Sequence, residues 1–126
     1  MEQKFIIYQL LLRVFGNTNE NCVSNGSLSF NGTGKFSSIT DEVFEHLHSL
    51  GVSHIWYTGV IEHATKESFE EYGIKKEDPS VVKGAAGSPY AIKDYYDVNP
   101  YLADSVPNRM AEFEDLVLRT HNAGFK

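Results

Sequence analysis

Residues 48–57 read HSLGVSHIWY, and this stretch decides the expected fold. Its first residues end a helical pattern, and Gly51 is suited to the left-handed conformation that closes a helix. A short β-branched and aromatic run then predicts a strand. Residues 121–126, HNAGFK, repeat the same order of helix end, glycine and first step of a strand. The chain is therefore expected to alternate helices with strands.

Hydrophobic periodicity extends this alternation along the chain. Residues 5–12, FIIYQLLL, form a nearly continuous apolar run, which is typical of a strand buried on both faces. Ser38 begins a helical pattern with its apolar residues on one face. The prediction is one domain over residues 1–126, with a strand at about 5–12, a helix at about 38–50, a strand at about 52–57, a long loop at about 58–107 and a helix at about 108–123.

Strand–helix alternation implies a parallel sheet with right-handed crossovers. The loops after the two strands are long, whereas the connection at Gly51 is short. Long loops after strands carry the sites of (β/α)8 barrel enzymes, which take roughly 250 residues. The predicted fold class is therefore α/β, an incomplete (β/α)8 TIM barrel with the first two strand–helix units and the start of a third strand at Phe125. A natural terminus with a frayed tail is the alternative.

Composition and charge exclude several partners. The chain is 41% hydrophobic with a formal net charge of −6, which favours a packed core and argues against a nucleic acid or an anionic membrane as partner. No apolar run approaches the roughly 20 residues of a membrane span. No signal peptide is expected in this chain, because no small-residue cleavage site follows its first apolar run. The compartment stays open between bacterial cytoplasm, periplasm and secretion.

Five segments occur in an order that resembles a known family. They are IIYQLLLRVFGN (6–17), GKFSSITD (34–41), LGVSHIWYTGV (50–60), SPYAIKDYYDVNP (88–100) and FEDLVLRTHNAGFK (113–126). Together they resemble the start of the catalytic barrel of the α-amylase family of glycoside hydrolases. The most specific segment is SPYAIKDYYDVNP, which is similar to the family motif in the loop after the second strand. Leu12 departs from the family, where many members have proline.

The resemblance implies a function for a longer parent protein. It implies a fragment of a retaining, α-glucan-active hydrolase, a starch-degrading enzyme of carbohydrate metabolism that binds α-glucan or maltooligosaccharide. A retaining glycosidase needs two carboxyl groups about 5–5.5 Å apart. In the family both come from strands that would follow Lys126, so no catalytic residue is expected in this truncated domain, which is predicted to be inactive alone. The alternative is a small stand-alone carbohydrate-binding or protein-interaction module.

The same resemblance assigns roles to four residues. Tyr90 aligns with the tyrosine that stacks on the sugar at the family's cleavage subsite, and a loop tyrosine packed on its own domain is the alternative. His63, just after the second strand, is a second and weaker candidate for substrate binding. Asp94 and Tyr96 are expected to hold the motif loop in shape, through hydrogen bonds to backbone N–H groups and ring packing.

Metal binding and self-association are the remaining expectations. The histidines lack the spacing of a zinc site. The loop GNTNEN resembles a calcium position of some amylases, but only Glu20 is charged there, so no metal or other cofactor is predicted for this chain, while calcium stays possible in the full-length parent. The strand at 5–12 has no second partner in the expected arrangement. Exposed apolar edges recruit other chains, which predicts a homo-oligomer through exposed strand edges.

Overall fold

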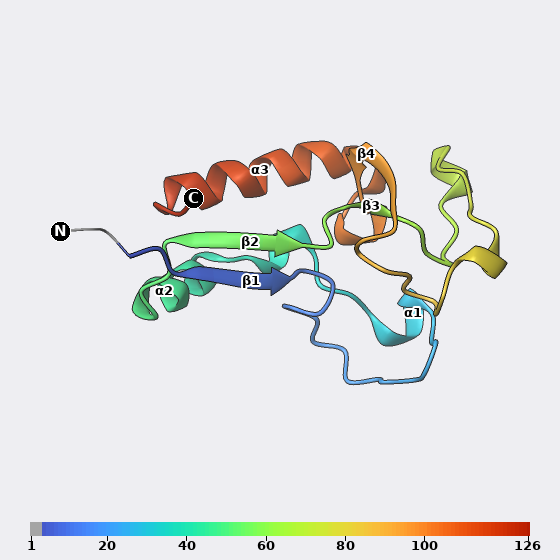
Figure 1. Ribbon diagram of the computed structural model, residues 1–126, viewed down its shortest axis with the longest axis horizontal. Helices are drawn as coiled ribbons and strands as arrows, with labels where there is room; N and C mark the ends of the chain where they lie inside the picture. Colours follow the sequence, from blue (N-terminus) through green and yellow to red (C-terminus); the bar gives the residue numbers. More distant parts are fainter. Residues whose placement is uncertain (1–3) are drawn as a thin grey trace.

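The computed structural model describes residues 4–126, so the first three residues of the predicted domain lie outside the described part. The described chain folds into two separate sheets and three α-helices joined by short 3-10 turns (Figure 1). The strands are β1 (Ile7–Leu11), β2 (His54–Thr58), β3 (Ile61–His63) and β4 (Ile92–Val98). The helices are α1 (Leu28–Asn31), α2 (Asp41–Ser49) and α3 (Arg109–Asn122).

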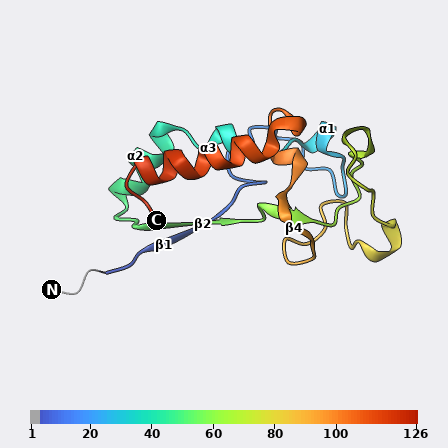
Figure 2. The same ribbon diagram turned by 90° about the horizontal axis from the view of Figure 1, so that it is seen from above.

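The first sheet pairs β1 with β2 in parallel, from Ile7 opposite His54 to Leu11 opposite Thr58. Parallel strands need a crossover connection, and α2 supplies it. Figure 2 shows that α2 and α3 lie on the same side of this sheet. Within residues 4–126, the opposite face of this sheet is therefore left uncovered by helices.

The sequence of α2 fits its place in the crossover. Asp41 and Glu42 occupy the first turn and two histidines the last, which suits the helix dipole at both ends. Gly51 follows with φ of +76°, a conformation that glycine adopts without steric cost. Phe44 and Leu47 are buried on the face that meets the sheet. The helix therefore has local signals for its start, its end and its buried face.

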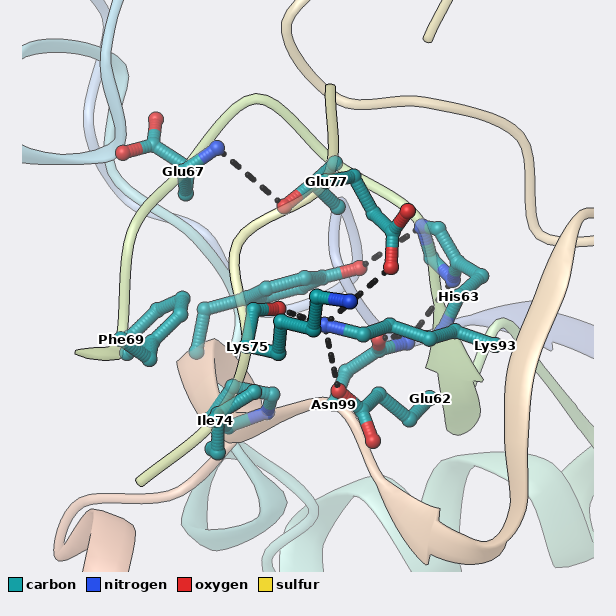
Figure 3. Close-up of a pocket in the computed structure, with 12 residues that line it drawn as sticks. Glu62, His63, Glu67, Phe69, Ile74, Lys75, Glu77, Lys93 and Asn99 are labelled. Atoms are coloured by element: carbon teal, nitrogen blue, oxygen red, sulfur yellow. Dashed lines mark hydrogen bonds and ion pairs between the residues drawn. The ribbon is translucent and has the colours of Figure 1, made fainter. Parts of the chain in front are cut away.

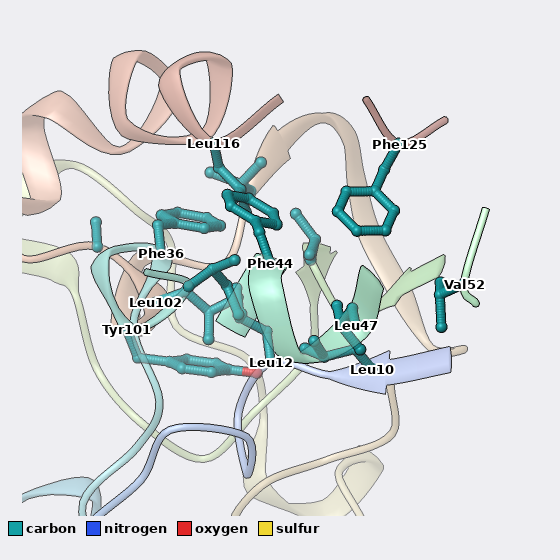
Figure 4. Packing of buried hydrophobic residues seen from close by; sticks show 14 residues of the cluster. Leu10, Leu12, Phe36, Phe44, Leu47, Val52, Tyr101, Leu102, Leu116 and Phe125 are labelled. Atoms are coloured by element: carbon teal, nitrogen blue, oxygen red, sulfur yellow. The ribbon is translucent and has the colours of Figure 1, made fainter. Parts of the chain in front are cut away.

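The hydrophobic core lies between the first sheet and the two long helices (Figure 4). Leu10 of β1 and Leu116 of α3 are almost fully buried in it. Alternate residues of β1 point away from the helices, and Ile7 remains 62% exposed. The run at 5–12 was expected to be buried on both faces, but in the described chain helices cover only one of them. The cluster consists of Leu10, Leu12, Phe36, Ile39, Phe44, Leu47, Val52, Val60, Val98, Tyr101, Leu102, Ala103, Leu116 and Phe125.

The second sheet is an antiparallel pair of β3 and β4. We call this pair the hairpin for brevity, although residues 64–91 separate its two strands in the sequence. It lies within residues 58–107, where the sequence predicts a long loop. Register shifts occur on both sides of Glu62, so the pairing is irregular. The tyrosines of β4 favour a strand, as aromatic residues do on a pleated surface.

The predicted fold class, an incomplete (β/α)8 TIM barrel, is wrong. The described residues form a small mixed α/β domain without a barrel-like arrangement of strand–helix units. In a barrel the strands form one closed sheet, whereas here the four strands are divided between a parallel pair and a separate antiparallel pair. Alternation of strands and helices specifies a parallel pair, but the pattern does not specify how many strands join one sheet.

The residues after α3 pack on the first sheet. Lys126 donates its backbone N–H to the carbonyl of Ser53 (3.1 Å) and accepts one from Ile55 (2.8 Å). The Phe125 ring is buried against Phe44 and His48. No strand is assigned to these residues, so the predicted start of a third strand at Phe125 is absent as a sheet element of the described chain.

Candidate functional site

Several polar side chains that are buried or partly buried lie together beneath the hairpin (Figure 3). β3 contributes Glu62 and His63, β4 contributes Lys93, and the turn after β4 contributes Asn99. The cavity among them is only about 20 Å³, which is room for about one water molecule. This region is therefore a packed polar cluster and not an open cleft.

Asn99 is the centre of the cluster. Its side chain is fully buried, and its Nδ2 donates to the carbonyls of Gly59 (2.7 Å) and Ile61 (3.1 Å). Its Oδ1 accepts the backbone N–H of His63 (3.0 Å). A single amide thus fixes the path of the chain from β2 into β3, because it satisfies three backbone groups of that segment.

His63 is held as a neutral ring by its neighbours. Nε2 lies 3.1 Å from the carbonyl of Ala86, which can only accept, so Nε2 carries the proton. Nδ1 lies 2.9 Å from Asn99 Nδ2, so it shares the two N–H groups of that amide with the carbonyls of Gly59 and Ile61. Burial lowers the pKa of His63, and the charge of Arg13 lowers it further, while the hydrogen bond to Ala86 opposes the change. Protonation at Nδ1 would set two donors against each other.

The buried carboxylate of Glu62 has a cationic partner, Lys93. Lys93 Nζ lies 3.5 Å from Glu62 and 3.5 Å from Glu77, and it also donates to the backbone carbonyl of Lys75 (Figure 3). Burial raises the pKa of Glu62, and the charge of Lys93 acts against this change. The lysine therefore links β4 to the turn that contains Glu77.

Asp97 makes the strongest ion pair of the hairpin. Arg109 Nε and Nη2 donate to its two carboxylate oxygens at 2.8 and 2.7 Å, so the pair is bidentate. Burial alone would raise the pKa of Asp97, but the hydrogen bonds from Arg109 and Val98 and the charge of Arg109 outweigh it and lower the pKa. This pair joins the end of β4 to the first turn of α3.

Three carboxylates of this region lie close together. One oxygen each from Glu62, Asp94 and Asp97 falls within 4.8 Å of the others. Such proximity suits a retaining pair, but Glu62 is only 5% exposed and is covered by Lys93, so a sugar cannot reach it together with Asp97. Proximity alone is not evidence of a metal either, because exposed acidic groups often cluster without one. We assign no catalytic or metal-binding role to these carboxylates.

Three tyrosines project from the hairpin region, and we call them the tyrosine surface. Tyr90 is 76% exposed, Tyr95 is 75% exposed and Tyr96 is 94% exposed. Asp94 Oδ1 accepts the backbone N–H of Tyr96 at 2.8 Å and fixes the local turn of β4. Exposed aromatic side chains present a large apolar ring and a polar hydroxyl, so these three tyrosines are candidates for a binding surface.

The structure separates the residues that the sequence singled out. Tyr90 lies on the surface, where a ligand can reach it, whereas His63 is buried in the polar cluster. Asp94 and Tyr96 are joined by the hydrogen bond described above, but the ring of Tyr96 packs against little. Sequence reasoning did not single out Asn99 as the centre of a cluster, nor Tyr95 as a surface residue. For Tyr95 a signal was present, since it stands beside Tyr96 in the motif.

No helix in residues 4–126 has both the length and the apolar composition that crossing a membrane requires. No protein-family model matches the sequence, and no curated protein matches it either. The likeness to the α-amylase family therefore stays a prediction that rests on the five quoted segments.

Proposed function

We propose that this chain contributes a sugar-binding surface to an α-glucan-active glycoside hydrolase of the α-amylase type. The observation that supports the proposal is the tyrosine surface, with Tyr90 in the sugar-stacking role that its motif suggests. The α-glucan specificity comes from the sequence resemblance, whereas the location of the contact surface comes from the exposure of the three rings.

Exposed tyrosines suit sugar binding for physical reasons. The C–H face of a pyranose ring is apolar enough to pack on an aromatic ring, and the phenol hydroxyl remains free for a hydrogen bond. A tyrosine has few rotatable bonds, so holding it against a ligand costs little conformational entropy. The neighbouring carboxylate of Asp94 offers an acceptor for sugar hydroxyls.

The proposal assigns binding, and not bond cleavage, to the described residues. Hydrolysis with retention needs one carboxylate as nucleophile and one carboxyl as acid/base, both open to the same glycosidic bond. Glu62 is sealed beneath Lys93, and Asp97 is neutralised by Arg109. This chain is therefore expected to release no reducing ends from starch by itself.

Calorimetric titration with maltoheptaose tests the proposal. We expect a dissociation constant of about 1 mM, or roughly −4 kcal/mol. Replacement of Tyr90, Tyr95 or Tyr96 by alanine is expected to weaken binding by about fivefold or more, because each change removes a stacking ring. Tyr72→Ala is the matched control, since Tyr72 is also exposed but lies in a separate turn. Absence of binding at about ten times the expected dissociation constant, or equal binding by all variants, would refute it.

Self-association is a second candidate function, and a specific surface favours it. Phe5, Ile7 and Trp56 are 69%, 62% and 53% exposed, on or beside the sheet. In the described chain β1 pairs only with β2, so its other edge is open. Exposed apolar patches above a few hundred Å² usually become interfaces, and an open edge accepts another strand. We infer that a second copy covers this surface. Sedimentation at low micromolar concentration is expected to give twice the monomer mass of 14.2 kDa, and a stable monomer would exclude it.

A further inference from the structure

A second pocket, of about 190 Å³, lies between the loop that follows β1 and the segment that precedes β4. Among the described residues, its lining includes two cationic side chains, Arg13 and Lys83, and no carboxylate. Asn25 Oδ1 accepts the backbone N–H of Ala85 at 3.2 Å and ties the two walls together. A cationic pocket is unexpected in a chain whose formal net charge is −6.

Arg13 lacks the partners that a partly buried guanidinium normally has. Its Nη1 is buried and has no hydrogen-bond partner within residues 4–126. No carboxylate of the described residues forms a salt bridge with it, and its guanidinium carbon lies 4.9 Å from the centroid of the Tyr101 ring. A desolvated cation without a counter-ion is costly. An anion beside it would offset that cost.

The glycine-rich wall of the pocket adds free donors. The backbone N–H groups of Gly84, Ala86 and Gly87 donate no hydrogen bond to any other described residue. Gly84 and Gly87 have φ of +75° and +66°, and Asn25 on the facing wall has φ of +56°. Turns that include left-handed residues often present successive N–H groups to anions.

We propose that this pocket binds a small oxyanion, either a phosphate or a carboxylate group, through the guanidinium of Arg13 and the ammonium of Lys83. A guanidinium attracts either group by its charge and donates hydrogen bonds to its oxygens, and the exposed lysine adds a second charge. The site uses no residue of the tyrosine surface, so it is independent of the proposed sugar binding.

Titration with inorganic phosphate, followed by amide chemical shifts at low ionic strength, tests the proposal. We expect saturable shifts at residues 84–87 with a dissociation constant of about 1 mM, weakened at high salt by charge screening. A parallel titration with acetate distinguishes the two groups: tighter phosphate binding assigns a tetrahedral anion, and tighter acetate binding assigns a carboxylate. Absence of saturable shifts with both anions would overturn the proposal.

Variants locate the binding to the pocket. Arg13→Gln and Lys83→Gln are each expected to weaken anion binding by about tenfold, the effect of losing one charged donor. Lys76→Gln is the matched control, because Lys76 is exposed and does not line this pocket. Lys83 is also exposed, so its variant keeps the fold and decides the test even if Arg13→Gln loses the Tyr101 contact and unfolds. Unchanged affinity in Lys83→Gln would overturn the proposal, whereas Tyr90→Ala is expected to leave anion binding intact.

Discussion

Replacement of Asn99 by alanine tests whether one buried amide holds the hairpin on the rest of the domain. The change removes the partners of two part-buried carbonyls, at Gly59 and Ile61, and of the buried backbone N–H of His63. Each unsatisfied buried group costs about 1–3 kcal/mol, and carbonyls tolerate the loss better than N–H groups. The expected loss in the free energy of unfolding is therefore about 3–5 kcal/mol, a large part of the roughly 5–15 kcal/mol typical of a domain.

Urea unfolding followed by circular dichroism measures this loss. The midpoint is expected to fall while the dependence on urea stays the same, because the surface exposed on unfolding is unchanged. Asn108→Ala is the control: that amide makes one exposed hydrogen bond, to Ser105 Oγ at 3.2 Å, and its loss is expected to cost less than about 0.5 kcal/mol. A cost below about 1 kcal/mol for Asn99→Ala would refute the reasoning, because the loss of the partner of the buried His63 N–H alone is expected to cost at least that much.

Two further predictions concern glycine and histidine. Gly87→Ala is expected to lower the free energy of unfolding by at least about 3 kcal/mol, because the added Cβ would lie 1.8 Å from the carbonyl oxygen of Ala64. Gly73→Ala is the control: Gly73 has a similar positive φ but open space around it, and the expected loss is about 1 kcal/mol. Equal losses in thermal unfolding would contradict the clash. Because the pKa of His63 is lowered from 6.5 in the folded chain, the unfolded chain binds the proton first, so the stability due to His63 is present above pH 6.5 and lost as the pH falls below it. Urea unfolding between pH 7.5 and 5.5 measures this loss. The control variant His46→Gln lacks an exposed ring but keeps His63, so it is expected to lose stability as the pH falls, whereas His63→Gln is expected to lose less. Identical pH dependence in both variants would count against the buried neutral ring.

Local patterns in the sequence located several elements, and their physics explains why. The apolar run at 5–12 contains β1, and the one-sided pattern at 38–50 contains α2, because strand and helix periods are set by nearest neighbours along the chain. The sequence analysis predicted a loop where the hairpin lies, because β3 has only three residues and pairs irregularly with β4. Which strands share one sheet depends on contacts between distant segments. Local sequence patterns carry no information on these contacts, so they could not correct the barrel prediction.

The candidate site shows the same division. Exposure of Tyr90 and the short-range bond from Asp94 to Tyr96 involve neighbours within a few residues, where motif reasoning is informative. Asn99 reaches Gly59 and His63 across 40 and 36 residues of chain. An asparagine before proline reads locally as a turn, and nothing in the adjacent residues indicates that its amide is buried. The unpartnered guanidinium of Arg13 is equally invisible in sequence, because it is defined by what surrounds it.

The buried cluster and the tyrosine surface are parts of one arrangement. Tyr95 and Tyr96 of β4 are both exposed, while Asp97 and Asn99 anchor the end of this strand to α3 and to the start of β3. An exposed aromatic ring contributes to binding only when its backbone is already fixed, since the entropy of ordering it would otherwise cancel the contact. The polar cluster, although closed to ligands, thus supplies the rigidity that a sugar-binding role for the tyrosines requires.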